Sequence, residues 1–278
     1  MSNKFILITG CSSGIGLDAV RRLKTRGYNV LASCRKPYDV GVLLQQGIDC
    51  IQLDLARSDS IQIALQDIKE HGQLYALVNN GAFGVPGAVE DISRAALQHQ
   101  FETNVFGTHE LTCACLKMML PHNEGRIIQI SSILGGLCLP MRGAYNASKY
   151  ALEALSDTLR LELHDTNIKV SLIQPGPIES LFRPNALREF KQYVYVKNSR
   201  YSRYYASVED RLGSIKSAPF TLPASAVSNS IIHALEAKTP KIRYRITRPS
   251  KVFLPLKRVL PDRWMDKLLL KLGDKPEK

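Results

Sequence analysis

The sequence predicts an α/β fold built on a doubly wound parallel sheet, and two features of the chain predict it. Short apolar runs alternate with helical patterns along the chain, which is typical of βαβ units. A glycine-rich turn, residues 9–16, joins the first apolar run to the first helical pattern. The 278 residues suit one large domain, and no linker, internal repeat or low-complexity tract divides them.

Seven segments are expected to form the strands. The first, 5–8, is wholly apolar, as is typical of a parallel strand buried on both faces. The others follow in chain order, with the last at the edge of the sheet: 29–34, 48–54, 74–79, 126–131, 169–174 and 241–246. Long helices are expected over 93–119 and 143–163. Because ligands of such sheets bind at the carboxyl ends of the strands, residues that follow each strand are the first candidates for a site.

The glycine-rich turn predicts a cradle for phosphate groups. Gly10 permits a tight turn, Gly14 lets a pyrophosphate approach the backbone, and Gly16 lets the helix pack on the strand. Free amides at the start of the helix then face the phosphates, with Ser12 or Ser13 as the N-cap. For this glycine spacing alone, an ordinary turn is the alternative.

Tyr145 and Lys149 stand one helical turn apart, and Ser132 precedes the tyrosine by thirteen residues. An ammonium group close to a phenol favours the phenolate, so we expect a lowered pKa for Tyr145. Such a tyrosine can give a proton to a carbonyl oxygen or take one from an alcohol. The same spacing arises by chance on amphipathic helices, so the interpretation depends on the nucleotide-binding turn in the same chain.

Together with Asn79-Asn80, these motifs resemble the short-chain dehydrogenase/reductase family over residues 4–250. The loop variant with Cys11, and the Gly-Pro-Ile run that begins at Gly176, are similar to the branch with 17β-hydroxysteroid and retinol dehydrogenases and bacterial NADP-dependent aldehyde reductases. The resemblance implies a Rossmann-type fold and an NADP(H)-dependent oxidoreductase. Such an enzyme interconverts apolar aldehydes or ketones and the corresponding alcohols.

The resemblance also implies four catalytic residues. Tyr145 is the general acid or base, and Ser132 donates a hydrogen bond to the substrate oxygen beside it. Lys149 also binds the nicotinamide ribose, and Asn104 interrupts its helix and holds a water relay to that lysine. An interior asparagine that only bends its helix is the alternative. Ser131 is expected to be a hydrogen bonder at the strand end.

Arg35, after the second strand, indicates NADP(H) because a cation suits the 2′-phosphate, whereas NAD sites usually carry an acidic residue there. A solvated charge at a strand end is the alternative. The resemblance extends the cofactor site to the catalytic pair and the turns after several strands. The full set is Gly10, Ser12, Ser13, Gly14, Ile15, Gly16, Arg35, Asp54, Leu55, Asn80, Tyr145, Lys149, Pro175, Gly176, Ile178 and Ser180.

Some of these positions carry specific expectations. Asn80 braces the central sheet, and Asp54 contacts adenine or, alternatively, caps the helix near Ser58. Residues 81–82 read Gly-Ala where the family has Ala-Gly, which alters how closely the cofactor ribose can approach. Ser180 stands where the family usually has threonine, so the hydroxyl contact with the carboxamide is retained.

Two later segments extend the expected catalytic domain, 1–250. Residues 181–217 are rich in tyrosine, and they are expected to form a lid over an apolar substrate or, alternatively, an amphipathic surface segment. Residues 251–278 form a basic amphipathic extension with Trp264 and several leucines. This extension docks on protein or contacts anionic lipid as a peripheral membrane element.

Composition narrows the other possibilities. Of a net charge of +12, most lies after residue 237, where 13 Lys/Arg face 4 Asp/Glu. The nearly neutral body lacks an aromatic and basic platform, so nucleic acid is not an expected partner. No apolar run reaches eighteen residues, no signal peptide is expected, and the six cysteines lack metal-ligand spacing. A reducing, cytoplasmic compartment and no metal site are predicted.

Two other functions compete with the enzyme. An NADP-sensing binding protein would use the lid and tail to recruit a partner and show little or no turnover. A sugar-nucleotide epimerase or dehydratase usually carries a larger C-terminal substrate domain than this chain allows. The family resemblance implies a homodimer or homotetramer through the helices over 93–119 and 143–163. The physiological substrate and the working direction stay open.

Overall fold

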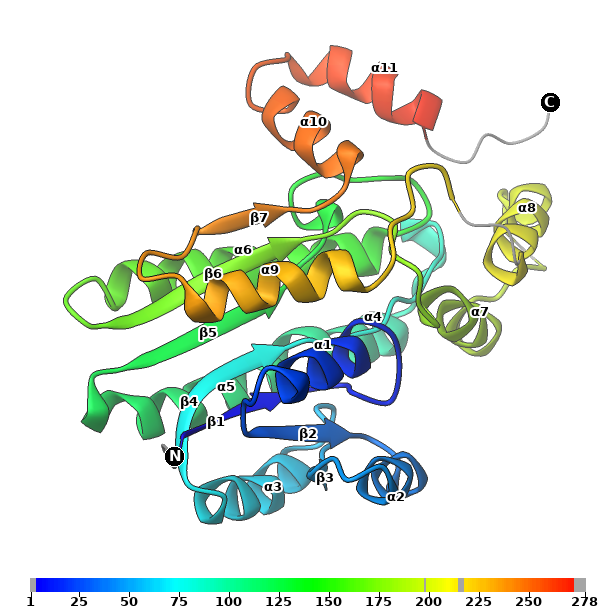
Figure 1. The fold of residues 1–278 in the computed structure, drawn as a ribbon. Coiled ribbons are helices and arrows are strands. Elements are labelled where there is room, and N and C mark those ends of the chain that lie inside the picture. Colours follow the sequence, from blue (N-terminus) through cyan, green and yellow to red (C-terminus); the bar gives the residue numbers. More distant parts are fainter. Residues whose placement is uncertain (1–3, 198, 215–217, 273–278) are drawn as a thin grey trace.

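The computed structural model describes residues 4–197, 199–214 and 218–272. It contains one seven-stranded parallel sheet with β7 at the edge, as predicted, and the strand order is β3-β2-β1-β4-β5-β6-β7 (Figure 1). The strands are β1 Lys4–Ile8, β2 Val30–Cys34, β3 Cys50–Gln52, β4 Gln73–Asn79, β5 Gly125–Ile130, β6 Ile168–Gln174 and β7 Arg243–Arg245. The edge strands β3 and β7 are shorter than the predicted 48–54 and 241–246.

Helices cover both faces of the sheet (Figure 1). Neighbouring residues of one strand enter opposite cores, as Leu7 and Ile8 of β1 do, which explains why most positions in the inner strands are apolar. The side chains of α1, α2 and α9 join one core, and those of α3 and α5 join the other, where Leu159 and Leu163 at the end of α6 also pack. These helices are α1 Gly14–Thr25, α2 Pro37–Gln45, α3 Ser58–Glu70, α5 Thr108–Met119, α6 Gly143–Glu162 and α9 Ser225–Glu236.

The helix predicted over 93–119 is interrupted. It consists of α4, Arg94–Phe101, a π-helical turn η2, Glu102–Gly107, and α5. A Cβ atom on Gly107 would lie 1.7 Å from the carbonyl oxygen of Leu55, so only glycine allows this approach. Packing against the turn after β3 therefore fixes the end of η2. Three short 3₁₀ turns complete this part: η1 Val89–Asp91, η3 Leu120–His122 and η4 Ile133–Gly135.

The tyrosine-rich segment forms α7, Phe182–Tyr193, and α8, Ser202–Gly213, which pack against each other. Tyr205 is only 1% exposed, and its hydroxyl binds the Ala88 amide and Asp91. Tyr195, in contrast, is 75% exposed. The tyrosines therefore divide between an internal core of this segment and its surface. Residues 198 and 215–217 of the predicted lid lie outside the described residues.

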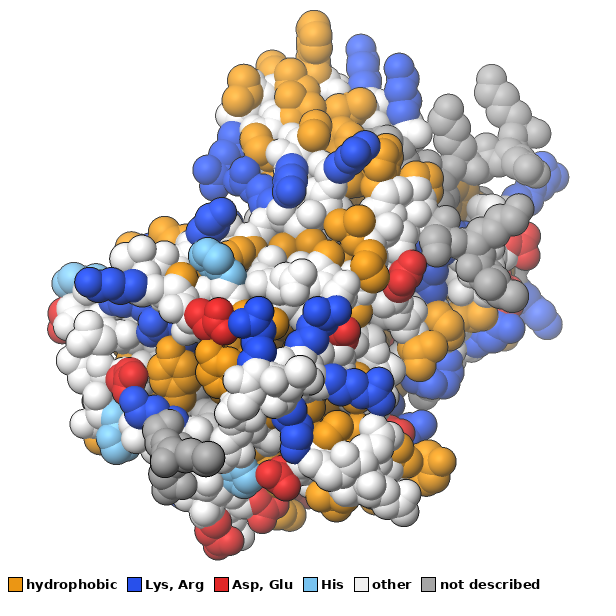
Figure 2. Space-filling model, viewed as in Figure 1, with side chains coloured by type: hydrophobic (Ala, Val, Ile, Leu, Met, Phe, Trp, Pro, Cys, Tyr) orange, Lys and Arg blue, Asp and Glu red, His pale blue; other side chains and the backbone are white. Residues whose placement is uncertain are grey.

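The chain ends in α10, Arg248–Leu256, and α11, Asp262–Leu272. Met265 and Leu269 of α11 are buried with Leu137 and Leu254, so this amphipathic helix docks on its own chain. Trp264 is 68% exposed, and Figure 2 shows apolar side chains beside Lys and Arg over this end of the molecule. The predicted boundary at residue 250 falls inside α10. Within the described ranges, no helix is both long and apolar enough to span a bilayer.

Candidate functional site

The glycine-rich turn lies between β1 and α1 with the geometry expected for close backbone approach. Gly10 and Gly14 have φ values of +70° and +58°, a region that favours glycine. A Cβ atom on Gly16 would lie 2.4 Å from the carbonyl oxygen of Gly10. Ser13 is the N-cap residue of α1, but its side chain accepts no capping hydrogen bond. The amides that begin α1 are thus without a side-chain cap, which suits an anion.

Asn80 ties the end of β4 to this turn. Its amide nitrogen donates to the carbonyl oxygens of Thr9, at 2.9 Å, and Gly10, at 3.0 Å. In return, the Thr9 hydroxyl accepts from the amides of Asn80 and Gly81. A Cβ atom on Gly10 would lie 2.7 Å from the Gly81 Cα, so two glycine backbones meet here. The glycine at position 81 fits this tight contact, because a Cβ there would press on the Leu55 side chain at 3.1 Å.

The turns after β2 and β3 lie at the same edge of the sheet. Arg35 is exposed, and its guanidinium has no hydrogen bond or ion pair within the described part of the chain. Asp54 accepts a hydrogen bond from the Ala56 amide and so forms a local turn. It does not cap α3, whose N-cap is Arg57. Leu55 is buried: its backbone lies against Gly107, and its side chain lies beside Gly81.

Ser132, Tyr145 and Lys149 come together at the carboxyl ends of the strands. Ser132 follows β5, and the other two residues lie in the first turns of α6. Ser132 interacts with the Tyr145 phenol and acts to lower its pKa. The Lys149 ammonium lies 5.8 Å from the centre of the Tyr145 ring and donates to the Ile130 carbonyl oxygen at 2.8 Å. The Ser131 hydroxyl, in contrast, is buried without a hydrogen-bond partner among the described residues, and it is the Ser131 amide that binds Ile173.

Asn104 connects the π-helical turn to this group. Its side chain accepts from the Phe83 amide and donates to the Phe83 carbonyl oxygen and the Ser148 hydroxyl. Ser148 in turn donates to the Tyr145 carbonyl oxygen at 2.8 Å. The predicted interruption of the helix at Asn104 is therefore present, and the asparagine supports the helical turn that carries the tyrosine.

The segment after β6 turns beside the same group. The carbonyl oxygen of Pro175 accepts from the Ile133 amide at 2.7 Å, which ties this turn to the one after Ser132. Residues 177 and 179 pair with Leu222, so the backbone groups of Ile178 point to the opposite side of that short bridge. Ser180 is exposed, and its Cβ lies close to Gly14, since a Cβ on that glycine would lie 3.1 Å from the Ser180 Cβ.

Comparison with known proteins identifies the family. A family model described as short chain dehydrogenase matches residues 4–189. This chain belongs to the short-chain dehydrogenases. It is 43% identical to the uncharacterized oxidoreductase YbbO of Escherichia coli K12 over 96% of the chain and 94% of that protein. It is 33% identical to retinol dehydrogenase 16 of Mus musculus over 100% of the chain and 91% of that protein. A short chain dehydrogenase from Burkholderia cenocepacia, solved in complex with NADP, has a TM-score of 0.74 at 20% identity and covers 97% of this chain and 99% of its own.

The electrostatics of this short-chain dehydrogenase differ from the sequence prediction in one respect. Burial raises the pKa of Tyr145 to about 12, although the hydrogen bond with Ser132 and the charge of Arg142 act to lower it. The predicted lowering by Lys149 was wrong in direction, because the cost of desolvating a phenolate exceeds these opposing effects. Burial also lowers the pKa of Lys149 to about 8, opposed by the charge of Glu153. Tyr145 therefore holds its proton at neutral pH.

Three residues around the site were not foreseen. Phe182, at the start of α7, meets the Tyr145 ring edge-on, with 5.3 Å between ring centres. Ser148 and Glu153 lie on α6 beside the reactive pair. Helical spacing could have found Glu153, which follows Lys149 by four residues. No local pattern predicts Phe182, because its approach to Tyr145 depends on how α7 packs.

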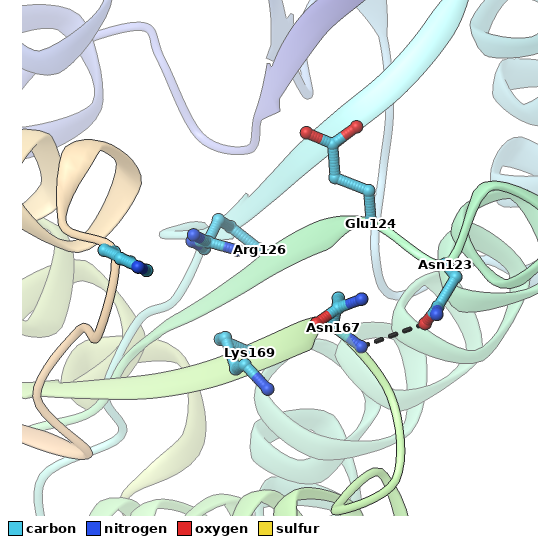
Figure 3. Close-up of a pocket in the computed structure, with 6 residues that line it drawn as sticks. Asn123, Glu124, Arg126, Asn167 and Lys169 are labelled. Atoms are coloured by element: carbon cyan, nitrogen blue, oxygen red, sulfur yellow. Dashed lines mark hydrogen bonds between the residues drawn. The ribbon is translucent and has the colours of Figure 1, made fainter.

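A depression on another part of the molecule does not belong to this site. Figure 3 shows it beside the start of β5 and β6, so it lies at the amino ends of these strands, whereas the turns described above lie at the carboxyl ends. Asn123 accepts there from the Asn167 amide at 2.9 Å, and Arg126 and Lys169 line the wall with Glu124 and Lys238. The charged side chains that line it are of both signs and are partly or fully exposed, and none of the predicted site residues lines it.

Proposed function

We propose that the protein is an NADP(H)-dependent oxidoreductase that interconverts apolar aldehydes or ketones and alcohols, with Tyr145 as the general acid or base. One observation carries the proposal: Ser132 interacts with the Tyr145 phenol, and the Lys149 ammonium lies 5.8 Å from the centre of the same ring. The glycine-rich turn opens onto the same edge of the sheet, so a substrate oxygen between serine and tyrosine would lie beside a dinucleotide held by that turn.

The residues present fit a dinucleotide. The uncapped start of α1 offers amides to the pyrophosphate, and Arg35 offers an exposed guanidinium to a 2′-phosphate. The Ile178 amide faces away from Leu222 and is proposed to bind the nicotinamide carboxamide, while the Ile178 carbonyl oxygen accepts from the Ser180 hydroxyl at 3.4 Å. The NADP complex of the Burkholderia relative supports NADP(H), as does the absence of an acidic side chain at position 35.

When bound, the reduced cofactor supplies hydride to the carbonyl carbon. Tyr145, protonated at neutral pH, gives its proton to the carbonyl oxygen, and Ser132 donates a hydrogen bond to that oxygen. Lys149 holds the cofactor ribose and presents a positive charge behind the phenol as negative charge develops. Reduction is the proposed working direction because the acid is already loaded with its proton.

An apolar substrate is proposed from the surroundings of the tyrosine. Phe182 meets the phenol edge-on, and a Cβ on Gly84 would lie 3.0 Å from the Phe182 ring, so an aromatic side chain covers one side of Tyr145. The likeness to retinol dehydrogenase 16 supports a long apolar substrate. The helices α7 and α8 are proposed to close over it and exclude water.

The test is an NADPH-consumption screen over aldehydes and ketones graded by chain length, with Tyr145→Phe run beside the unmodified chain. Loss of the phenol should reduce turnover by roughly 10²–10⁴-fold while NADPH still binds. Equal turnover in both proteins would exclude Tyr145 as the acid. NADPH binding without turnover over the whole panel would favour the NADP-sensing binding protein instead.

A further expectation concerns the oligomeric state. A homodimer or homotetramer is proposed through α4, η2, α5 and α6, where Leu97, Phe106 and Leu155 are exposed apolar side chains. Light scattering after gel filtration measures the mass directly, and a monomer at micromolar concentration would contradict the proposal.

A cytoplasmic location with peripheral membrane contact is proposed for the protein. The contact would be made by the outer side of α11, which carries Arg263, Lys267 and exposed Trp264. Co-sedimentation with anionic vesicles, and its loss in Trp264→Ser, measures that contact.

A further inference from the structure

Glu153 is a buried carboxylate that the proposed chemistry does not use. It is only 7% exposed and lies on α6 one helical turn after Lys149, on the same face. A buried charge is costly unless partners satisfy it. Glu153 has two such partners: one carboxylate oxygen accepts from the Gln174 amide at 2.9 Å, and the other accepts from the Arg243 guanidinium at 3.1 Å.

These two partners come from two different strands of the sheet. Gln174 ends β6 directly before the Pro175 turn, and Arg243 begins β7. Arg243 also binds Asp157, one turn further along α6. On the remaining side, a Cβ on Gly135 would lie 3.0 Å from the Glu153 Cγ, so the turn after Ser132 covers the glutamate stem. The carboxylate is therefore fixed in position under the site.

Lys149 needs a fixed negative charge nearby. It is 3% exposed, and its one hydrogen bond to a described residue goes to the neutral Ile130 carbonyl oxygen. The titratable groups that face it within the described ranges are Tyr145, which is protonated at neutral pH, and Glu153. Burial lowers the pKa of Lys149 to about 8, and the charge of Glu153 opposes this effect. Glu153 thus supplies the compensating charge for a buried ammonium.

We propose that Glu153 is a positioning residue that keeps Lys149 charged and oriented beneath the cofactor ribose, with Gln174 and Arg243 as its anchors. The inference rests on the proposed function, because it assigns a role to a neighbour of the proposed catalytic lysine. A buried ion pair contributes little to stability compared with apolar packing, so the arrangement is better explained by the charge that it provides than by folding.

The experiment compares Glu153→Gln with the control Asp157→Asn, which removes the other carboxylate bound to Arg243. NADPH-dependent reduction is measured from pH 6 to pH 10. In Glu153→Gln, the alkaline limit, the pH above which kcat/KM falls, should move down by about one pH unit, because Glu153 lies one helical turn from Lys149 and its charge opposes the lowering of the Lys149 pKa. Asp157→Asn should leave the limit in place. A uniform loss of activity at all pH values in Glu153→Gln, with an unmoved limit, would mean a merely structural role and overturn the inference.

A second readout needs neither cofactor nor turnover. The pKa of Lys149 is lower in the folded protein, about 8, than its ordinary value of 10.5, so the unfolded chain binds the extra proton between these pH values. The free energy of unfolding therefore rises with pH across this window. In Glu153→Gln, the rise should begin at lower pH. An unchanged onset contradicts the inference even if the proposed reaction is wrong, whereas an active Tyr145→Phe variant contradicts the reaction alone.

If Glu153→Gln does not fold, Arg243→Gln provides a second variant, for which the pH limit is expected to shift in the opposite direction. Removing the guanidinium leaves the carboxylate less neutralised, so the alkaline limit should move upward. A downward shift, or none, would overturn the inference.

Discussion

Thr9 offers a sharp test of how neighbouring residues hold the glycine-rich turn in place. It directly follows β1, is 1% exposed, and accepts hydrogen bonds from two amides: those of Asn80 at 3.0 Å and Gly81 at 2.9 Å. Thr9→Val keeps the shape of the side chain and removes the acceptor. Both amides then lose their partner at a place where Gly10 and Gly81 pack backbone against backbone and leave no room for another group between them.

The expected cost follows from the number of amides left unsatisfied. Each buried donor without a partner costs about 1–3 kcal/mol, so two partly buried ones should lower the free energy of unfolding by about 2–4 kcal/mol. For a chain of this size, that loss lowers the Tm by roughly 4–16 °C. The control Thr9→Ser keeps the hydroxyl and loses only a buried methyl group, which costs about 1 kcal/mol.

Urea unfolding at neutral pH measures both variants, and NADPH titration by fluorescence measures the turn itself. Thr9→Val should be the less stable variant and should bind NADPH more weakly, because the Asn80 end of the connection is no longer held. If Thr9→Val were as stable as Thr9→Ser, the two amides would not depend on the hydroxyl. The account of this connection would then be refuted.

Three other substitutions test separate parts of the structure. Arg35→Glu should weaken NADPH binding by roughly 10–100-fold and leave NADH binding less affected, because the lost contact is a charge-assisted hydrogen bond to phosphate. Isothermal titration measures both affinities, and equal losses for the two cofactors would argue against a 2′-phosphate site. Gly107→Ala should destabilise by about 3 kcal/mol or more in urea, because its Cβ meets the Leu55 carbonyl at 1.7 Å, whereas Gly41→Ala, with nothing within 4 Å, should be neutral or slightly stabilising. Met265→Ala should cost about 2–4 kcal/mol, and the exposed Leu270→Ala under about 0.5 kcal/mol; similar melting temperatures would mean that α11 is not docked.

Local pattern predicted the parts of the molecule that depend on local chemistry. The alternation of short apolar runs with helical patterns predicted all seven strands, because most positions of a strand that is buried on both faces are apolar. The glycine spacing predicted the turn between β1 and α1, where positive φ values need glycine. The interruption at Asn104 followed from the family resemblance, and the structure adds its cause in the contacts with Phe83 and Ser148.

Tertiary packing decided the rest. The pKa of Tyr145 depends on how deeply the phenol is buried, which spacing on a helix does not reveal. The amphipathic pattern of α11 fits a protein surface and a membrane equally well, until Leu137 and Leu254 are found against Met265. The contact between Glu153 and Arg243 joins residues ninety positions apart, and no pattern in either segment indicates it.

The docking of α11 limits how related chains can differ in length. Leu137 belongs to the turn that follows Ser132, and it is shielded by side chains from the last two helices. A homologue that stops before this point would leave that leucine facing water in the segment that follows Ser132. We expect shorter relatives to carry a polar or smaller side chain there, so the length of the tail and the residue at position 137 should vary together.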